Sequence, residues 1–115
     1  MTEEECTIED IGGFLEDRTA RRILIEASAE PVSAETLSEA TGVSKPTIYR
    51  RLAAMRRCDL LVERTQLDPE GGHHHTRFAT NLERIVVELT EDGMNYELHH
   101  REAMADRFTR LIEGM

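Results

Sequence analysis

The sequence SAETLSEATGVSKPTIYRRLAAMRRC, residues 33–58, predicts two short helices joined by a tight turn. Leu37 and Ala40 give the first helix an inward stripe, and the turn falls at Gly42, because glycine adopts a left-handed backbone cheaply. Ser44 is placed to cap the second helix, and Pro46 falls in its first turn, where a missing N–H costs nothing. This order is typical of a helix-turn-helix.

The second helix, residues 44–58, has two chemically different faces. Ile48, Leu52 and Met55 recur at i, i+4 and i+7, so they are expected to point into a core. Five of the chain's fourteen basic residues lie between Lys45 and Arg57, with no acid among them. Small and basic residues suit a DNA major groove, because Arg pairs with guanine edges or phosphates and Ala or Thr allows close approach. A solvated basic face is the alternative, and the turn and spacing favour DNA.

The net charge of the chain is negative, which is the opposite of what a nucleic-acid-binding protein usually has. Its 115 residues predict a single domain, 1–115, whose net charge is −9. Thirteen of its fourteen basic residues are Arg, a bias that, with the abundant acids, is typical of the acidic proteome of an extreme halophile. The net charge would then reflect adaptation to salt, and the local field near Arg50 would decide the encounter with DNA.

The sequence also carries information on membrane spans, targeting signals and cysteine spacing. No apolar run is long enough to span a membrane, and the N-terminus is acidic, so we expect a cytoplasmic protein with no membrane partner. Cys6 and Cys58 are far apart in sequence and form no CxxC motif. We therefore expect neither a structural zinc site nor a disulfide framework, and no cofactor.

Two helices are expected before the helix-turn-helix. Residues 8–16 carry an apolar stripe of Ile8, Ile11, Phe14 and Leu15, interrupted by two glycines. Residues 17–29 form a firmer helix, capped by Asp17 and ended by Pro31, whose inward stripe is Ala20, Ile23, Leu24 and Ala27. Residues 17–58 are thus the predicted helical core.

After Cys58 the apolar period changes from that of a helix to that of a strand. Residues 61–66 and 76–80 read as a hairpin within 61–80, and a helix-turn-helix followed by a hairpin is a winged helix. Arg64, Arg77 and the His73–His75 run would lie near phosphates or a groove. His73 and His75 share a strand face and could hold an ion, but no further ligand lies nearby in sequence, so DNA contact is the favoured interpretation.

The last third, residues 84–115, predicts a second hairpin and a terminal helix. Residues 84–89 and 94–98 alternate in polarity around an Asp-Gly turn at 90–93. A helix at about 103–113 has an apolar face of Met104, Phe108, Leu111, Ile112 and Met115, which would pack on its own domain or on a second copy. The expected class is α+β, mainly α: a winged helix-turn-helix with a second β-hairpin and a C-terminal amphipathic helix.

The chain resembles the ArsR-like winged helix-turn-helix transcription regulators in the order of three segments, which are DRTARRILIEA, SAETLSEATGVSKPTIYRRLAAM and a wing. Its last third is similar to small haloarchaeal members of that group in the segments VELTEDGMNYEL and ADRFTRLIEGM. The resemblance implies a homodimer, a repressor that reads a palindromic site in double-stranded DNA through two recognition helices. The DNA-binding candidates are Ser44, Lys45, Thr47, Tyr49, Arg50, Arg51, Arg57, Arg64, His73, His74, His75 and Arg77.

Other functions are weighed against this one. Residues 37–43 lack the paired cysteines of metal-sensing relatives, and the few aromatics argue against a small-molecule pocket. Cys58 ends the recognition helix, so a redox-responsive regulator switched through a dimer-spanning or mixed disulfide is one alternative, and a simple buried residue is the other. A winged-helix interaction module without DNA binding would need an apolar or acidic recognition face. An enzyme is not expected, because no catalytic constellation is present.

Overall fold

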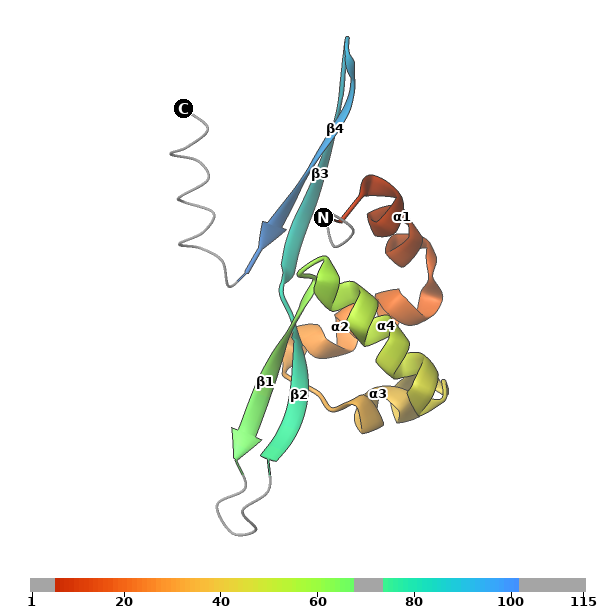
Figure 1. The fold of residues 1–115 in the computed structure, drawn as a ribbon, viewed down its shortest axis with the longest axis vertical. Helices are drawn as coiled ribbons and strands as arrows, with labels where there is room; N and C mark the ends of the chain where they lie inside the picture. The colour runs from red at the N-terminus through yellow and green to blue at the C-terminus, as the bar shows by residue number, and fades with distance from the viewer. Residues whose placement is uncertain (1–5, 68–73, 102–115) are drawn as a thin grey trace. The chain divides into compact units, whose positions relative to one another are not determined.

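The computed structural model describes residues 6–67 and 74–101, and the chain divides into two compact units, residues 1–80 and 81–115. The elements follow in the order α1 (Ile8–Glu16), α2 (Arg18–Ala29), α3 (Ala34–Thr41), α4 (Lys45–Arg57), β1 (Leu61–Leu67), β2 (His74–Thr80), β3 (Leu82–Thr90) and β4 (Gly93–His100) (Figure 1). Four helices and two antiparallel hairpins confirm the α+β, mainly α class of a winged helix-turn-helix. The expected helix at 103–113 lies outside the described residues.

Side-chain caps define the first two helices at the predicted positions. Thr7 and Asp10 form a capping box: the Thr7 hydroxyl accepts from Asp10 N–H, and the Asp10 carboxylate accepts from Thr7 N–H, both at 3.1 Å. Asp17 caps α2 as expected, accepting from Ala20 N–H at 3.0 Å. Ile11 is the fully buried member of the α1 stripe, whereas Leu15 is exposed.

The helix-turn-helix forms as predicted, with one difference at the start of α4. Gly42 ends α3 in the left-handed region, at φ 74°, and the Ser38 hydroxyl donates to the carbonyl of Val43 across the turn. Ser44 is the N-cap residue of α4, but its side chain accepts no backbone N–H and instead donates to the Thr47 hydroxyl at 3.2 Å. Pro46 in the first turn has no N–H and so needs no acceptor, which removes part of the demand for a cap.

The wing packs on the helical core through β2 and the segment before α3. Val32 and Phe78 exchange two backbone hydrogen bonds, of 2.9 and 2.7 Å, so the loop between α2 and α3 adds a short third strand. The Thr80 hydroxyl donates to the Leu24 carbonyl at 2.7 Å. The largest fully buried side chains of this unit are Ile23, Leu37, Ile48, Leu52, Met55, Leu60 and Leu61.

The second unit, as far as the structure describes it, is the hairpin β3–β4. Its turn pairs Thr90 with Gly93, and Gly93 has a positive φ of 146°, which explains the Asp-Gly signature. The strands extend beyond the predicted 84–89 and 94–98. Val87, Leu89 and Met94 are more than half exposed on this unit. Among the described helices, none is long and apolar enough to cross a membrane.

Candidate nucleic-acid interface

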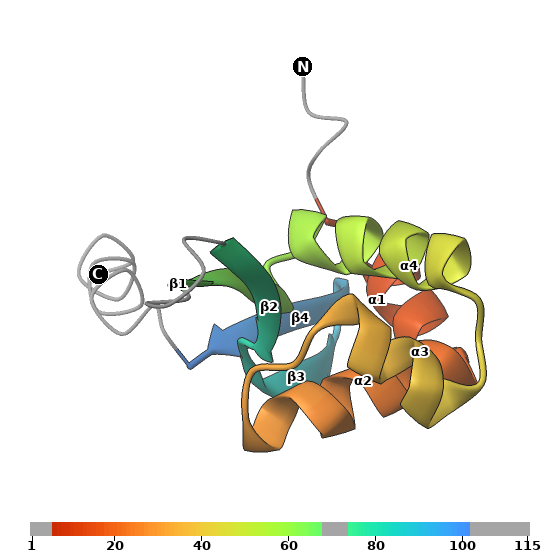
Figure 2. The ribbon, with the colours of Figure 1, turned by 90° about the horizontal axis from the view of Figure 1, so that it is seen from below.

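Helix α4 turns its apolar face into the core and leaves its basic face outside. Ile48, Leu52 and Met55 are at most 1% exposed, as the periodicity predicted. Figure 2 shows α4 along one side of the helical group. Lys45, Tyr49, Arg50 and the small Ala53 are exposed, and Tyr49 reaches 55% exposure. A helix with a small residue among cations can approach another molecule closely.

The cations of α4 differ in their partners. Lys45 Nζ lies 3.1 Å from Glu35 Oε2, and Arg56 Nη1 lies 2.7 Å from Glu63 Oε2. Arg50 donates only to the neutral Thr47 hydroxyl, at 3.0 Å, and Arg57 is exposed. Within the described part of the chain, neither Arg50 nor Arg57 has a carboxylate partner. These two guanidiniums therefore carry the uncompensated positive charge of the helix.

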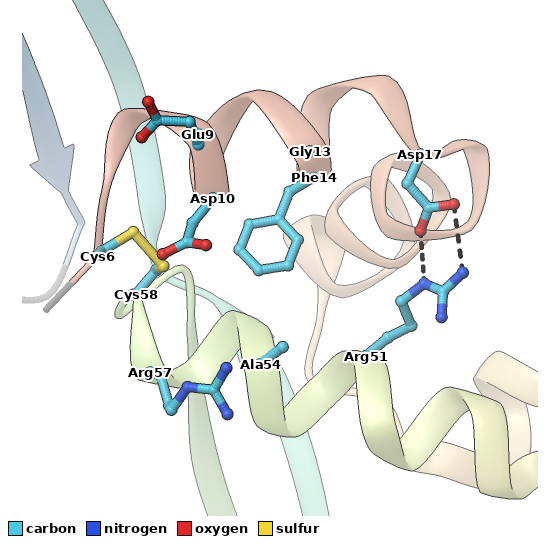
Figure 3. A pocket seen from close by; sticks show the side chains of 10 residues that line it. All are labelled: Cys6, Glu9, Asp10, Gly13, Phe14, Asp17, Arg51, Ala54, Arg57 and Cys58. Atoms are coloured by element: carbon cyan, nitrogen blue, oxygen red, sulfur yellow. Dashed lines mark hydrogen bonds and ion pairs between the residues drawn. A yellow bond between two sulfur atoms is a disulfide. The ribbon is translucent and has the colours of Figure 1, made fainter. Parts of the chain in front are cut away.

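Arg51, one of the predicted DNA-binding residues, is held by an acid of the same unit. Its Nε lies 2.6 Å from Asp17 Oδ2, and Nη2 lies 3.4 Å from Oδ1, so the guanidinium joins α4 to the N-cap of α2 (Figure 3). The hydrogen bond from Arg51 lowers the pKa of Asp17, against a smaller opposing effect of burial, and the same bond raises the pKa of Arg51. The sequence marked Asp17 as a cap, but the spacing of 34 residues hid its second partner.

The wing places two arginines opposite one another. Arg64 and Arg77 are register partners in β1–β2, so their side chains leave the same face, and His75 lies two positions along that face. The Arg77 Nε atom is buried without a hydrogen-bond partner. His74 pairs with Leu67 in register, its side chain is not described, and His73 lies outside the described residues.

The cysteines contradict the expectation that they are unconnected. Cys6 and Cys58 form a disulfide within one chain, joining the residue before the α1 cap to the C-cap of α4. Cys58 is 5% exposed, so it is also the buried residue considered above. The pairing is therefore neither dimer-spanning nor mixed. Two cysteines 52 residues apart give no local signal, so sequence reasoning overlooked Cys6.

A cavity of about 500 Å³ opens between α1 and α4 beside this disulfide. It is lined by Cys6, Glu9, Asp10, Gly13, Phe14, Asp17, Arg51, Ala54, Arg57 and Cys58 (Figure 3). The Phe14 ring lies between the disulfide and the Asp17–Arg51 ion pair, and Arg51 and Arg57 both come from α4. The lining is polar and mixed in charge, unlike the largely apolar pockets that bind small molecules.

Comparison with known protein families supports the functional class. Residues 23–65, from α2 into β1, match the IclR helix-turn-helix domain, whereas the residues outside this range are not part of the match. That domain is a DNA-binding regulatory module and not a catalytic one, so the match supports a DNA-binding transcription regulator with a winged helix-turn-helix. A comparison with curated proteins gives no match.

Proposed function

We propose that the chain is a sequence-specific transcription regulator, a homodimeric repressor that reads a palindromic site in double-stranded DNA through α4 and the β1–β2 wing. The observation that carries the proposal is the exposed basic face of α4 inside the segment that matches the IclR helix-turn-helix domain. An acidic or apolar face would have favoured a protein-interaction module instead.

Different residues of the interface receive different roles. Arg50 and Tyr49 lie on the exposed face with Lys45 and Thr47, so we assign them to base edges. Arg57 at the end of α4 is assigned to a phosphate, since phosphate contacts set the register of the protein on the duplex. In the wing, Arg64 and Arg77 are assigned to the phosphates of the DNA backbone, because they are register partners on one face of the β1–β2 hairpin. Arg51 is assigned to the fold, because Asp17 holds it.

The test is selection of bound sequences from a random DNA pool by the full chain, followed by affinity measurement on the enriched site over a range of salt concentrations. Arg50→Ala is expected to weaken specific binding by about tenfold or more, since a bidentate base contact contributes about 1–3 kcal/mol. Arg57→Ala should weaken binding to all sequences and reduce the salt slope by about one.

The matched control is Arg22→Ala, which removes an exposed arginine from α2 that is paired with Glu26 at 2.8 Å. Its affinity should equal that of the unaltered chain. A pool without any enriched sequence, or equal losses in Arg22→Ala and Arg50→Ala, would contradict a sequence-specific regulator and favour the interaction module.

The finer parts of the assignment stay predictions. They are the ArsR-like subtype, the haloarchaeal resemblance, the cytoplasmic location and repression as opposed to activation. Reporter expression from a promoter that carries the selected site, with and without the protein, separates repression from activation.

The disulfide favours a second candidate, a redox-responsive regulator. In compartments that hold DNA, disulfides are typically transient and redox-sensing. Cys58 ends the helix that carries Arg50, so reduction would release that end of α4 from the start of α1. DNA affinity of the oxidised and reduced chain should then differ, whereas Cys6→Ser should bind with one affinity under both conditions. Equal affinity of the unaltered chain in both states would remove this candidate.

A further inference from the structure

Three potential metal ligands from distant parts of the first unit meet at one point. The sulfurs of Cys6 and Cys58 and a carboxylate oxygen of Asp10 all lie within 4.8 Å of one another. Cys6 precedes α1, Asp10 belongs to its first turn, and Cys58 caps α4, and Figure 3 shows the Asp10 carboxylate directed at the two sulfurs. We propose that, once the disulfide is reduced, these residues form a binding site for a thiophilic divalent cation, Zn²⁺ above all.

The chemistry of the change balances within the cluster. A cellular dithiol supplies two electrons and two protons, the S–S bond breaks, Cys6 and Cys58 become thiols, and the donor becomes a disulfide. Zn²⁺ then displaces both thiol protons to solvent and binds two thiolates. Oxidation by a peroxide reverses the sequence: the two sulfurs join again, the metal leaves and the peroxide is reduced. The disulfide and the metal therefore exclude one another.

The dimensions of the cluster suit tetrahedral zinc. Zn–S bonds of about 2.3 Å and Zn–O bonds of about 2.0–2.2 Å place neighbouring ligand atoms about 3.5–3.8 Å apart. The three ligand atoms already lie within 4.8 Å of one another, and the two sulfurs move apart to this separation once the S–S bond is broken. Two thiolates and one carboxylate also match the preference of zinc for sulfur with harder ligands.

The carboxylate of Asp10 is already oriented. Its Oδ2 accepts the Thr7 backbone N–H at 3.1 Å, while Oδ1 makes no hydrogen bond among the residues that the structure describes. The capping box thus fixes the side chain with one oxygen open. Such supporting hydrogen bonds orient metal ligands and strengthen binding.

The charges around the cluster suit a zinc complex. Cys6 and Asp10 lie at the N-terminal end of α1, where the helix dipole favours negatively charged ligands. Two thiolates and one carboxylate leave one net negative charge on the zinc complex, and Arg57 lines the same cavity. The cavity admits the ion and leaves space for a water molecule as the fourth ligand, with Glu9 on the same wall.

The proposal concerns metal binding and does not depend on the DNA-binding role. Its consequence for the fold is that the start of α1 and the end of α4 stay joined in both redox states, by a covalent bond in one and by an ion in the other. The separation of 52 residues hides the cluster from sequence inspection, because zinc motifs are read from closely spaced ligand pairs.

The test uses the full chain, reduced with a phosphine and freed of metal, with Co²⁺ as a spectroscopic probe and Zn²⁺ competing against a chromophoric chelator. The reduced chain is expected to bind one Co²⁺ with a thiolate-to-cobalt charge-transfer band, and Zn²⁺ should displace it. The oxidised chain should show no such band. Binding without the band in both redox states would overturn the proposal and point to the His73–His75 run.

The variants separate ligands from bystanders. Cys6→Ser should lose most of the charge-transfer band. Asp10→Asn keeps an acceptor for Thr7 N–H, so α1 should stay capped while zinc affinity falls by about 10-fold to 100-fold. Glu16→Gln, an exposed acid at the other end of α1, is the matched control and should bind as the unaltered chain does. An Asp10→Asn affinity equal to that of Glu16→Gln would exclude Asp10 and overturn the three-ligand site.

Discussion

Reduction of the Cys6–Cys58 disulfide should lower the stability of the first unit by an amount that follows from its loop length. The crosslink spans 52 residues, and the entropy that such a loop removes from the unfolded chain is about 14 cal/mol/K. At 25 °C this corresponds to about 4 kcal/mol. Residual structure in the unfolded chain makes the value an upper bound.

The assay is urea unfolding of the oxidised and the reduced full chain, followed by the far-ultraviolet circular dichroism of the helices. All four described helices belong to the first unit, so this signal reports on the crosslinked part. A chelator must be present, since a bound metal would replace the lost crosslink. Thermal unfolding should show the same effect as a decrease in Tm of about 15 °C, at about 4 °C per kcal/mol.

Cys6→Ser provides the control, because Cys6 is only half-buried and its replacement disturbs the core less than a change at Cys58. This variant should unfold at the urea concentration of the reduced chain and should not respond to reductant. A difference below about 1 kcal/mol between the oxidised and reduced chain would refute the loop-entropy argument, as would a reductant effect of equal size in Cys6→Ser.

Three further predictions concern one ion pair, one backbone conformation and one exposed side chain. The pKa of Asp17 is lowered in the folded state, so its contribution to stability is complete above the ordinary value of 3.8 and is lost as the pH falls through the folded-state pKa. The Asp17→Asn variant should therefore show a smaller loss of stability over that pH interval. Circular dichroism as a function of pH measures this difference. Gly42→Ala meets no neighbouring atom but places a Cβ at φ 74°, so urea unfolding should show a loss of about 1–2 kcal/mol, and an unchanged midpoint would contradict the backbone strain. If β3–β4 contributes to the homodimer, Leu89→Glu on its exposed apolar residue should give a monomer by light scattering, whereas Glu88→Gln should not.

Local signals were enough to predict the elements of the fold. The capping side chains of Thr7 and Asp17 lie at the predicted helix starts, and Gly42 and Gly93 have the positive φ values that the turns require. Ile48, with its partners on the same stripe, is buried as the helical period implied. The short strand at Val32 was not predicted, because one residue pair with Phe78 leaves no periodicity in the sequence.

The candidate site was predictable only where one element carries it. The basic face of α4 follows from the helical period alone, whereas the partners of its cations come from other elements. Asp17 engages Arg51 and Glu63 engages Arg56, and no local pattern distinguishes these arginines from Arg50. Sequence therefore indicates a set of cations, and the tertiary structure separates those that are compensated from those that are not.

The contacts that sequence could not predict share one consequence: they fix α4 against the helices that precede the helix-turn-helix. Arg51 binds the α2 cap at the middle of α4, and Cys58 binds Cys6 at its C-terminal end. The buried stripe packs α4 against the core, and the Arg51–Asp17 ion pair and the disulfide add two connections to the residues before α2. The position of α4, and with it of Arg50, is thus set partly by residues 6–17, which lie outside the segment that matches the helix-turn-helix domain. Under the proposed redox and metal chemistry at Cys6 and Cys58, a change of state at that end of the unit would act on α4 directly, through its own C-cap residue.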